Sequence, residues 1–251
     1  MDGLRAILFD FGGTLDSDGL TWPQRFFPLY RDAGVVQSFD VFLKAFYLSD
    51  DALTKRHRLA GLDLEKTVAL QAAGVLESLA PGRADLAQAV ARRFTADCRR
   101  YLTRNRPLLE RLKEDYRLAV VSNFYGNMPD VLKGEGFGDL FDAVTDSGAV
   151  GVVKPDPLLF NHALKALGVA AAEALMVGDS LPRDIRGAEA LGIRHAWLDL
   201  SDAPACCPQG ARLRNLLELE GVLEPVSLSR AAGNSSFSLS REAGEGRGEG
   251  S

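Results

Sequence analysis

The sequence contains few cysteines, and their positions suggest neither a metal site nor a set of disulfides. The three cysteines are Cys98 and the adjacent pair Cys206 and Cys207. A zinc site or a disulfide framework requires several ligands or partners at characteristic spacings, which these residues do not provide. We therefore expect neither kind of site, and we expect the protein to work in a reducing cytoplasm.

Long hydrophobic runs and an excess of basic residues are also missing. No segment approaches the ~18 apolar residues of a membrane-spanning helix. The apolar run near the N-terminus covers only Ala6–Phe9 and is stopped by Asp10, so it does not resemble a signal peptide. The formal net charge is −5 and the isoelectric point is near 5.3. These features argue against a membrane or a nucleic acid as the partner.

Apolar residues, in contrast, are abundant enough for a large core. The chain has 251 residues, of which 46% are hydrophobic, so it can form one core or one core with a smaller satellite domain. Between residues 18 and 104 the apolar residues recur at helical spacing, and no part of this block has the pattern of a strand. The expected helices include 22–30, 39–47, 64–79 and 85–102.

From Arg106 onward, short apolar runs alternate with helical patterns. Together with the first run, the expected strands are 6–9, 118–121, 143–145, 174–177 and 195–198. Strands that alternate with helices predict a parallel sheet with helices on both faces. The sequence therefore predicts an α/β protein with a doubly wound parallel sheet, interrupted after its first strand by an α-helical domain.

This pattern gives a domain division. Residues 1–16 and 106–222 would form the α/β core, and residues 17–105 the helical domain. Pro107 would open a new core helix as a first-turn residue, and residues 212–219 would form a short helix. The segment after residue 226 is rich in Gly, Ser, Arg and Glu. We therefore expect a disordered tail over residues 223–251.

Polar residues follow several of the expected strands at the point where each one ends. They are Asp10, Ser122, Asn123 and Asp179, with Lys154 and Asp184 in nearby loops. Ligands of open parallel sheets bind beyond the carboxyl ends of the strands, so these side chains should converge. Carboxylates beside a lysine favour a divalent cation, best Mg²⁺, next to a phosphate. Taken singly, each of these residues could also simply cap a helix or a turn.

Four motifs extend this interpretation. The segments DFGGT, VVSN, VVKPDP and GDSLPRD, with the GA that follows, resemble the four motifs of the haloacid dehalogenase-like hydrolase superfamily. They occur in the order of that family, and the resemblance covers roughly Leu4–Leu200. It implies a Rossmann-like core, with the helical block as the cap domain of the family.

The resemblance also implies roles in catalysis. Asp10 would be the nucleophile, attacking phosphorus to give an aspartyl-phosphate that water then hydrolyses. Ser122 would donate a hydrogen bond to the transferred phosphoryl group, and Asn123 beside it would help to bind substrate. Lys154 would offset the charge between Asp10 and the phosphate. The implied substrate is a small phosphorylated metabolite, whereas the oligomeric state is not implied.

The same resemblance implies a Mg²⁺ site. Asp10 and Asp179 would supply carboxylate ligands, Asp184 would complete the acidic loop, and Gly12 would offer its backbone carbonyl. Phosphatases of the family usually carry a second aspartate at the position of Gly12, which protonates the leaving group and then activates water. Because general acid–base catalysis is typically worth ~10²–10⁴-fold, we expect slow hydrolysis of alkyl phosphates. A Gly12→Asp substitution should then raise the activity.

Other residues could replace the missing acid. Asp16, Asp18 and His57 are candidates, but we interpret Asp16 as a solvated loop carboxylate and His57 as part of a solvated helix face. The aromatic residues Trp22, Phe26, Phe27 and Tyr30 could line the substrate side of the cap, although packing among the cap helices is the favoured interpretation.

Gly12 leaves alternative functions open. The chain could be a catalytically weakened protein that binds phosphate and metal, or a regulatory protein. It could also cleave a bond other than a phosphoester, because relatives that act on carbon–halogen or carbon–phosphorus bonds lack the second aspartate too. Asp179 and Asp184 argue against dehalogenation, which needs no metal. A phosphonate hydrolase would need a cap lysine, for which Lys44, Lys55 and Lys66 are candidates.

Overall fold

The centre of the molecule is a six-stranded sheet. The structure is a computed structural model that describes residues 3–201 and 210–223. The strands lie in the order β3-β2-β1-β4-β5-β6, and every neighbouring pair is parallel. Their bounds are β1 Ala6–Phe9, β2 Arg117–Ser122, β3 Ala143–Asp146, β4 Ala174–Gly178, β5 Arg194–Leu198 and β6 Ala211–Leu213. Residues 224–251 of the expected tail, and the pair Cys206 and Cys207, lie outside the described residues.

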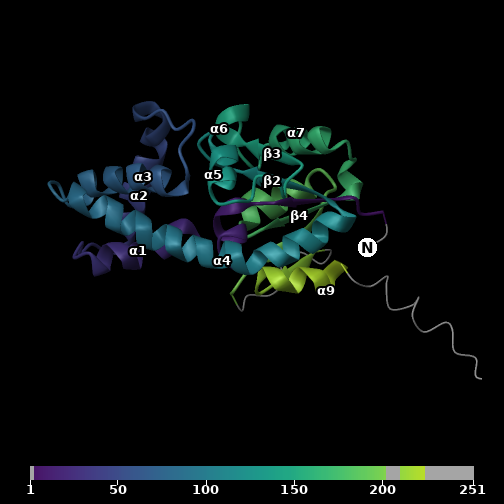
Figure 1. Ribbon diagram of the computed structural model, residues 1–251, viewed down its shortest axis with the longest axis horizontal. Helices are drawn as coiled ribbons and strands as arrows, with labels where there is room; N and C mark the ends of the chain where they lie inside the picture. Colours follow the sequence, from purple (N-terminus) through teal and green to yellow (C-terminus); the bar gives the residue numbers. More distant parts are fainter. Residues whose placement is uncertain (1–2, 202–209, 224–251) are drawn as a thin grey trace, which may run out of the picture.

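Helices cover this sheet and form a separate block beside it (Figure 1). Their bounds are α1 Trp22–Asp32, α2 Phe39–Arg56, α3 Leu64–Leu79, α4 Ala87–Asp115, α5 Met128–Gly134, α6 Ser147–Val150, α7 Pro157–Leu167, α8 Arg186–Glu189 and α9 Leu219–Leu223. Single turns are η1 Phe11–Leu15, η2 Ala84–Leu86, η3 Ala171–Glu173, η4 Leu181–Ile185 and η5 Leu216–Glu218. Within the described part of the chain, no helix has both the length and the hydropathy that crossing a bilayer requires.

Side chains along β1 point alternately to the two faces of the sheet, so they contribute to two separate parts of the core. Ile7 and Phe9 pack in one cluster with apolar residues of α4 and α9, whereas Leu8 packs in another with residues of α7, such as Phe160. All residues of β1 are fully buried, as expected for a central strand of a parallel sheet. Figure 1 shows α7 on one side of the sheet and α4 and α9 on the other. The predicted doubly wound architecture is confirmed.

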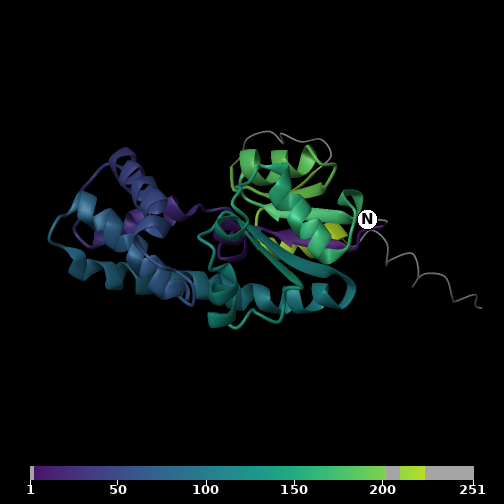
Figure 2. The same cartoon turned by 90° about the horizontal axis from the view of Figure 1, so that it is seen from above.

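The helix α4 corrects the prediction made for Pro107. Pro107 was expected to begin a new helix, but it lies inside a single helix of 29 residues. Proline cannot donate its backbone hydrogen bond, which weakens a helix interior. Here Leu102 on one side and Leu108, Leu109 and Leu112 on the other are all buried, so packing holds the helix together. Figure 2 shows α4 reaching from the helical block to the sheet.

The last strand, β6, was not predicted. Residues 212–219 were expected to be helical, but Ala211–Leu213 pairs in parallel with β5, with Ala211 opposite Ala196. The helical part begins only after Asn215, whose side chain accepts a hydrogen bond from the Leu217 N–H. A strand of three residues at a sheet edge has too little periodicity to be distinguished from a helix turn in the sequence.

Candidate active site

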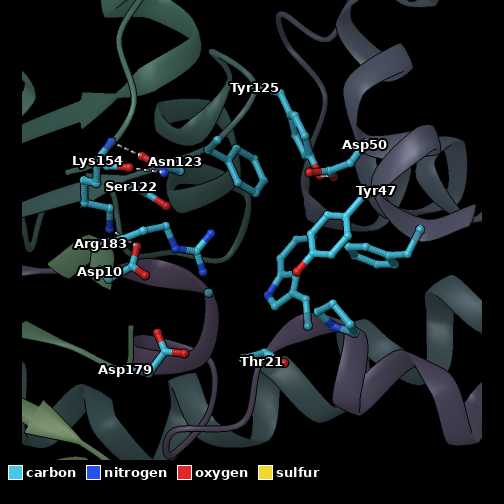
Figure 3. Close-up of a pocket in the computed structure, with 15 residues that line it drawn as sticks. Asp10, Thr21, Tyr47, Asp50, Ser122, Asn123, Tyr125, Lys154, Asp179 and Arg183 are labelled. Carbon is cyan, nitrogen blue, oxygen red and sulfur yellow. Dashed lines mark hydrogen bonds and ion pairs between the residues drawn. The ribbon is translucent and has the colours of Figure 1, made fainter. Parts of the chain in front are cut away.

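The strand-end residues converge on one pocket between the sheet and the helical block (Figure 3). Asp10 follows β1, Ser122 ends β2, and Asp179 follows β4. Lys154 reaches the same place from the loop before α7. From the helical block, hereafter the cap (α1, α2, α3 and the first half of α4), the lining residues are Thr21, Trp22, Pro23, Phe46, Tyr47 and Asp50.

Lys154 links two of the carboxylates. Its Nζ atom lies 2.7 Å from Asp10 Oδ1 and 2.7 Å from Asp184 Oδ1, and it donates a hydrogen bond to the Val121 carbonyl at 2.7 Å. The lysine side chain is 1% exposed. Burial by itself would lower the pKa of Lys154, but Asp10 and Asp184 outweigh it, so the pKa is raised. The lysine is therefore held as a cation beside Asp10.

The acidic residues form a cluster with an excess of negative charge. Asp10, Asp179 and Asp184 each place a carboxylate oxygen within 4.8 Å of the other two. Burial, followed by the charges of Asp10 and Asp184, raises the pKa of Asp179 well above its usual value. Three carboxylates around one lysine leave a deficit of positive charge, which a hard divalent cation with oxygen ligands would satisfy. The donor set thus fits Mg²⁺.

Two glycines make room for this cluster. Gly13 has a φ of +94°, and a Cβ there would lie 2.5 Å from Asp179 Oδ2. A Cβ at Gly178 would lie 2.4 Å from Asp184 Oδ2. Any larger residue would displace a carboxylate, so the glycines are part of the acidic site.

Asn123 holds the loop that carries Lys154. Its Oδ1 accepts a hydrogen bond from the Lys154 backbone N–H at 2.7 Å, and its Nδ2 donates to the Lys154 carbonyl at 3.2 Å. Figure 3 shows both bonds. Both polar atoms of the side chain are thus engaged with the backbone. This geometry makes Asn123 a positioning residue for Lys154, and both Asn123 and Ser122 line the pocket.

Asp16 is buried, and its interpretation as a solvated loop carboxylate is wrong. It accepts hydrogen bonds from Gly13 N–H at 2.7 Å, Trp22 Nε1 at 2.8 Å and Arg25 Nη1 at 2.9 Å. The side chain of Asp16 is 0% exposed and that of Arg25 is 5% exposed. The carboxylate therefore joins the turn after β1 to α1 of the cap. Because its bonds are all used in this way, it is a poor candidate for the missing acid.

The other expected replacements for the acid lie elsewhere. Asp18 forms an ion pair with Arg104 at 2.6 Å, and His57 is exposed at the end of α2. The candidate lysines of a phosphonate hydrolase, Lys44, Lys55 and Lys66, are exposed as well. None of these residues is among the described residues that line the pocket.

The indole of Trp22 lies where a side chain at position 12 would begin. A Cβ on Gly12 would meet Trp22 Nε1 at 3.0 Å and Cδ1 at 3.3 Å. The indole is held there by its hydrogen bond to Asp16. Phe26 and Tyr30 are buried among the cap helices, which confirms packing as their role, and Trp22 alone of the four expected aromatic residues lines the pocket.

Sequence patterns did not identify Asp50, Tyr125 and Arg183, which also line the pocket. The Tyr125 hydroxyl donates a hydrogen bond to Asp50 Oδ1, joining the core loop after β2 to α2 of the cap. Burial raises the pKa of Asp50 to about 6, although the bond from Tyr125 works in the opposite direction. Only the tertiary structure brings these residues together, because they are far apart in the sequence.

Curated relatives match parts of the chain. A phosphoserine phosphatase from Thermus thermophilus is 39% identical over 127 residues, which is 48% of this chain and 50% of that protein. A glyceraldehyde 3-phosphate phosphatase from Pyrococcus abyssi is 43% identical over 95 residues, or 37% of this chain and 40% of that protein. The chain therefore spans half or less of the length of these relatives.

Solved structures match over a greater length. A haloacid dehalogenase-family phosphatase from Thermococcus onnurineus is 25% identical, with a TM-score of 0.52 over 88% of this chain and 98% of that one. A dehalogenase reaches a TM-score of 0.61 over 88% of this chain and 98% of that one, at 20% identity, which is a likeness of fold alone. A sequence model of the haloacid dehalogenase-like hydrolases matches residues 4–192. With this match and the acidic pocket at the strand ends, the chain belongs to the haloacid dehalogenase-like hydrolase family.

Proposed function

We propose that this hydrolase is a Mg²⁺-dependent phosphatase that cleaves a small phosphorylated metabolite through an aspartyl-phosphate on Asp10. The observation that carries the proposal is the contact of Asp10 with Lys154, inside a cluster of three carboxylates at the base of the pocket. Two of the similar proteins bear phosphatase names, phosphoserine phosphatase and glyceraldehyde 3-phosphate phosphatase, which supports phosphate ester substrates.

The side chains would divide the reaction as follows. Asp10 forms a bond to phosphorus while the bond from phosphorus to the leaving alcohol breaks, and water then cleaves the aspartyl-phosphate to release phosphate. Lys154 offsets the charge on the transferred group, and Ser122 donates a hydrogen bond to it. Asp10, Asp179, Asp184 and the Gly12 carbonyl would hold Mg²⁺, which supplies further neutralisation of the phosphate charge.

The first test is hydrolysis of p-nitrophenyl phosphate with and without Mg²⁺. This leaving group needs little protonation, so the assay examines the nucleophile and the metal without demanding an acid at position 12. We expect turnover that requires Mg²⁺ and falls to background in Asp10→Asn. As a matched control, Asp32→Asn changes an exposed carboxylate and should leave the rate unchanged. Turnover that persists in Asp10→Asn would overturn the proposed mechanism.

A second test measures metal binding by stability. At 100 times its Kd, a ligand that binds only the folded state adds about 2.7 kcal/mol, which raises the Tm of a chain of this size by about 5–10 °C. We expect Mg²⁺ to produce such a shift in the wild type. In Asp179→Asn the shift should largely disappear, because one carboxylate ligand is lost. An equal shift in both proteins would place the metal elsewhere.

A specific observation favours a second candidate function. Gly12 offers no acid, and Trp22 lies against the space that such a side chain would need. The chain could therefore be a catalytically weakened protein that keeps the site for metal and phosphate in order to bind or to regulate. A folded protein that binds Mg²⁺ but does not hydrolyse p-nitrophenyl phosphate would support this function over the phosphatase.

A further inference from the structure

The cap side of the pocket carries a carboxylate that the proposed phosphatase mechanism does not use. Figure 3 shows Asp50 and Tyr47 on one wall, opposite Asp10, Ser122 and Lys154. Asp50 Oδ1 accepts a hydrogen bond from the Tyr125 hydroxyl. The other oxygen, Oδ2, accepts none from the described residues, and Asp50 lines the pocket. This oxygen is therefore available to a ligand that reaches across from Asp10.

Aromatic side chains line the same pocket. Trp22, Phe46, Tyr47 and Tyr125 all line it together with Asp50. Aromatic rings attract cations through their faces, and a carboxylate attracts them by charge. A second anionic group on a substrate would instead be repelled by Asp50. The combination of rings and a carboxylate is thus selective for a cationic group.

The charges near Asp50 leave room for such a cation. Arg183 is close enough for its positive charge to lower the pKa of Asp50, but among the described ion pairs none joins the two residues, and the Arg183 Nε donates to Ser180 Oγ at 3.1 Å. Figure 3 shows the Arg183 guanidinium on the side of Asp10 and Ser122, where a phosphate would bind. Burial raises the pKa of Asp50 to about 6, because the protein compensates only partly for the hydration that the charged carboxylate loses. A bound cation would complete that compensation.

We infer that Asp50, together with the aromatic rings that line the pocket, forms a subsite for a primary ammonium on the leaving group. The substrate would then be a small aminoalkyl phosphate, with its phosphate at Asp10 and its ammonium at Asp50 Oδ2. This inference rests on the proposed phosphatase function for the position of the phosphate. It adds the chemical class of the rest of the substrate.

The test uses two substrates that differ in one group. In 2-aminoethyl phosphate an ammonium occupies the position of the terminal methyl group of propyl phosphate. Hydrogen bonds to charged groups predict that the wild type prefers the amine by about 10- to 100-fold in kcat/KM. Asp50→Asn should remove most of this preference, because it keeps an acceptor for Tyr125 but loses the charge. Asp51→Asn, an exposed neighbour on α2, is the matched control and should keep it.

A binding measurement separates this inference from the proposed function. Calorimetry in the presence of Mg²⁺ would compare 3-aminopropylphosphonate with butylphosphonate, in which a methylene replaces the ester oxygen, so that neither has an ester bond to hydrolyse. Tighter binding of the amine, lost in Asp50→Asn, would support the subsite even if no phosphatase activity were found. Equal binding of the two probes, in a protein that hydrolyses p-nitrophenyl phosphate, would overturn the subsite and leave the proposed function intact. Equal preference in the wild type and Asp50→Asn would also overturn it.

Discussion

Gly12→Asp combined with Trp22→Phe is expected to raise kcat/KM for propyl phosphate by about 10²-fold over Trp22→Phe alone. The added carboxyl stands two residues after Asp10, where phosphatases of the family usually carry their acid. Alone, Gly12→Asp should gain much less, because its Cβ would meet Trp22 Nε1 at 3.0 Å. Trp22→Phe removes the indole Nε1 atom and replaces the two-ring indole with a smaller phenyl ring, which leaves more space next to position 12.

A comparison of two substrates shows whether the gain in kcat/KM comes from proton transfer to the leaving group. Propyl phosphate has a poor leaving group and should respond strongly, whereas p-nitrophenyl phosphate should respond little. Gly12→Ala with Trp22→Phe adds the same Cβ without a carboxyl, and it should give no gain. If the folded, Mg²⁺-binding Gly12→Asp double variant is no faster than this control, the missing acid is not what limits the rate.

Arg25→Met is expected to lower the free energy of unfolding by about 3–5 kcal/mol, because it leaves a buried carboxylate without its cation. Arg25 Nη1 lies 2.9 Å from Asp16 Oδ2, and both side chains are almost fully buried. Methionine has a similar length and can occupy the same space without the charge. The measurement is urea unfolding followed by fluorescence and by circular dichroism.

Two further variants give this prediction its controls. Arg93→Met removes the partner of Asp32 in a pair whose side chains are 53% and 57% exposed, and it should cost less than about 1 kcal/mol. Arg25→Met with Asp16→Asn removes both charges, so part of the lost stability should return. A loss in Arg25→Met no larger than in Arg93→Met would show that the buried pair does not hold the cap to the core.

Local patterns in the chain were sufficient to predict the sheet and the base of the site. Apolar runs such as Ala6–Phe9 were recognisable as buried strands because a central parallel strand is apolar on both faces. The residues after such runs lie at one edge of the sheet, which is why Asp10, Ser122 and Asp179 could be placed together. Helix α4 continues through Pro107, and the short strand β6 pairs with β5. Both features depend on contacts between residues far apart in the sequence, and both were predicted wrongly.

The family, the parallel sheet and the chemistry at the strand ends could be predicted from the sequence, because each is indicated by patterns within short segments of the chain. The tertiary structure decided what surrounds that chemistry. It buried Asp16 against Arg25, placed Trp22 over Gly12, and brought Asp50 of the cap to Tyr125 of the core. The distances along the sequence between the members of these pairs follow no helix or strand periodicity, so sequence patterns do not predict the contacts. Only the packing of the cap on the core fixes which of their side chains meet.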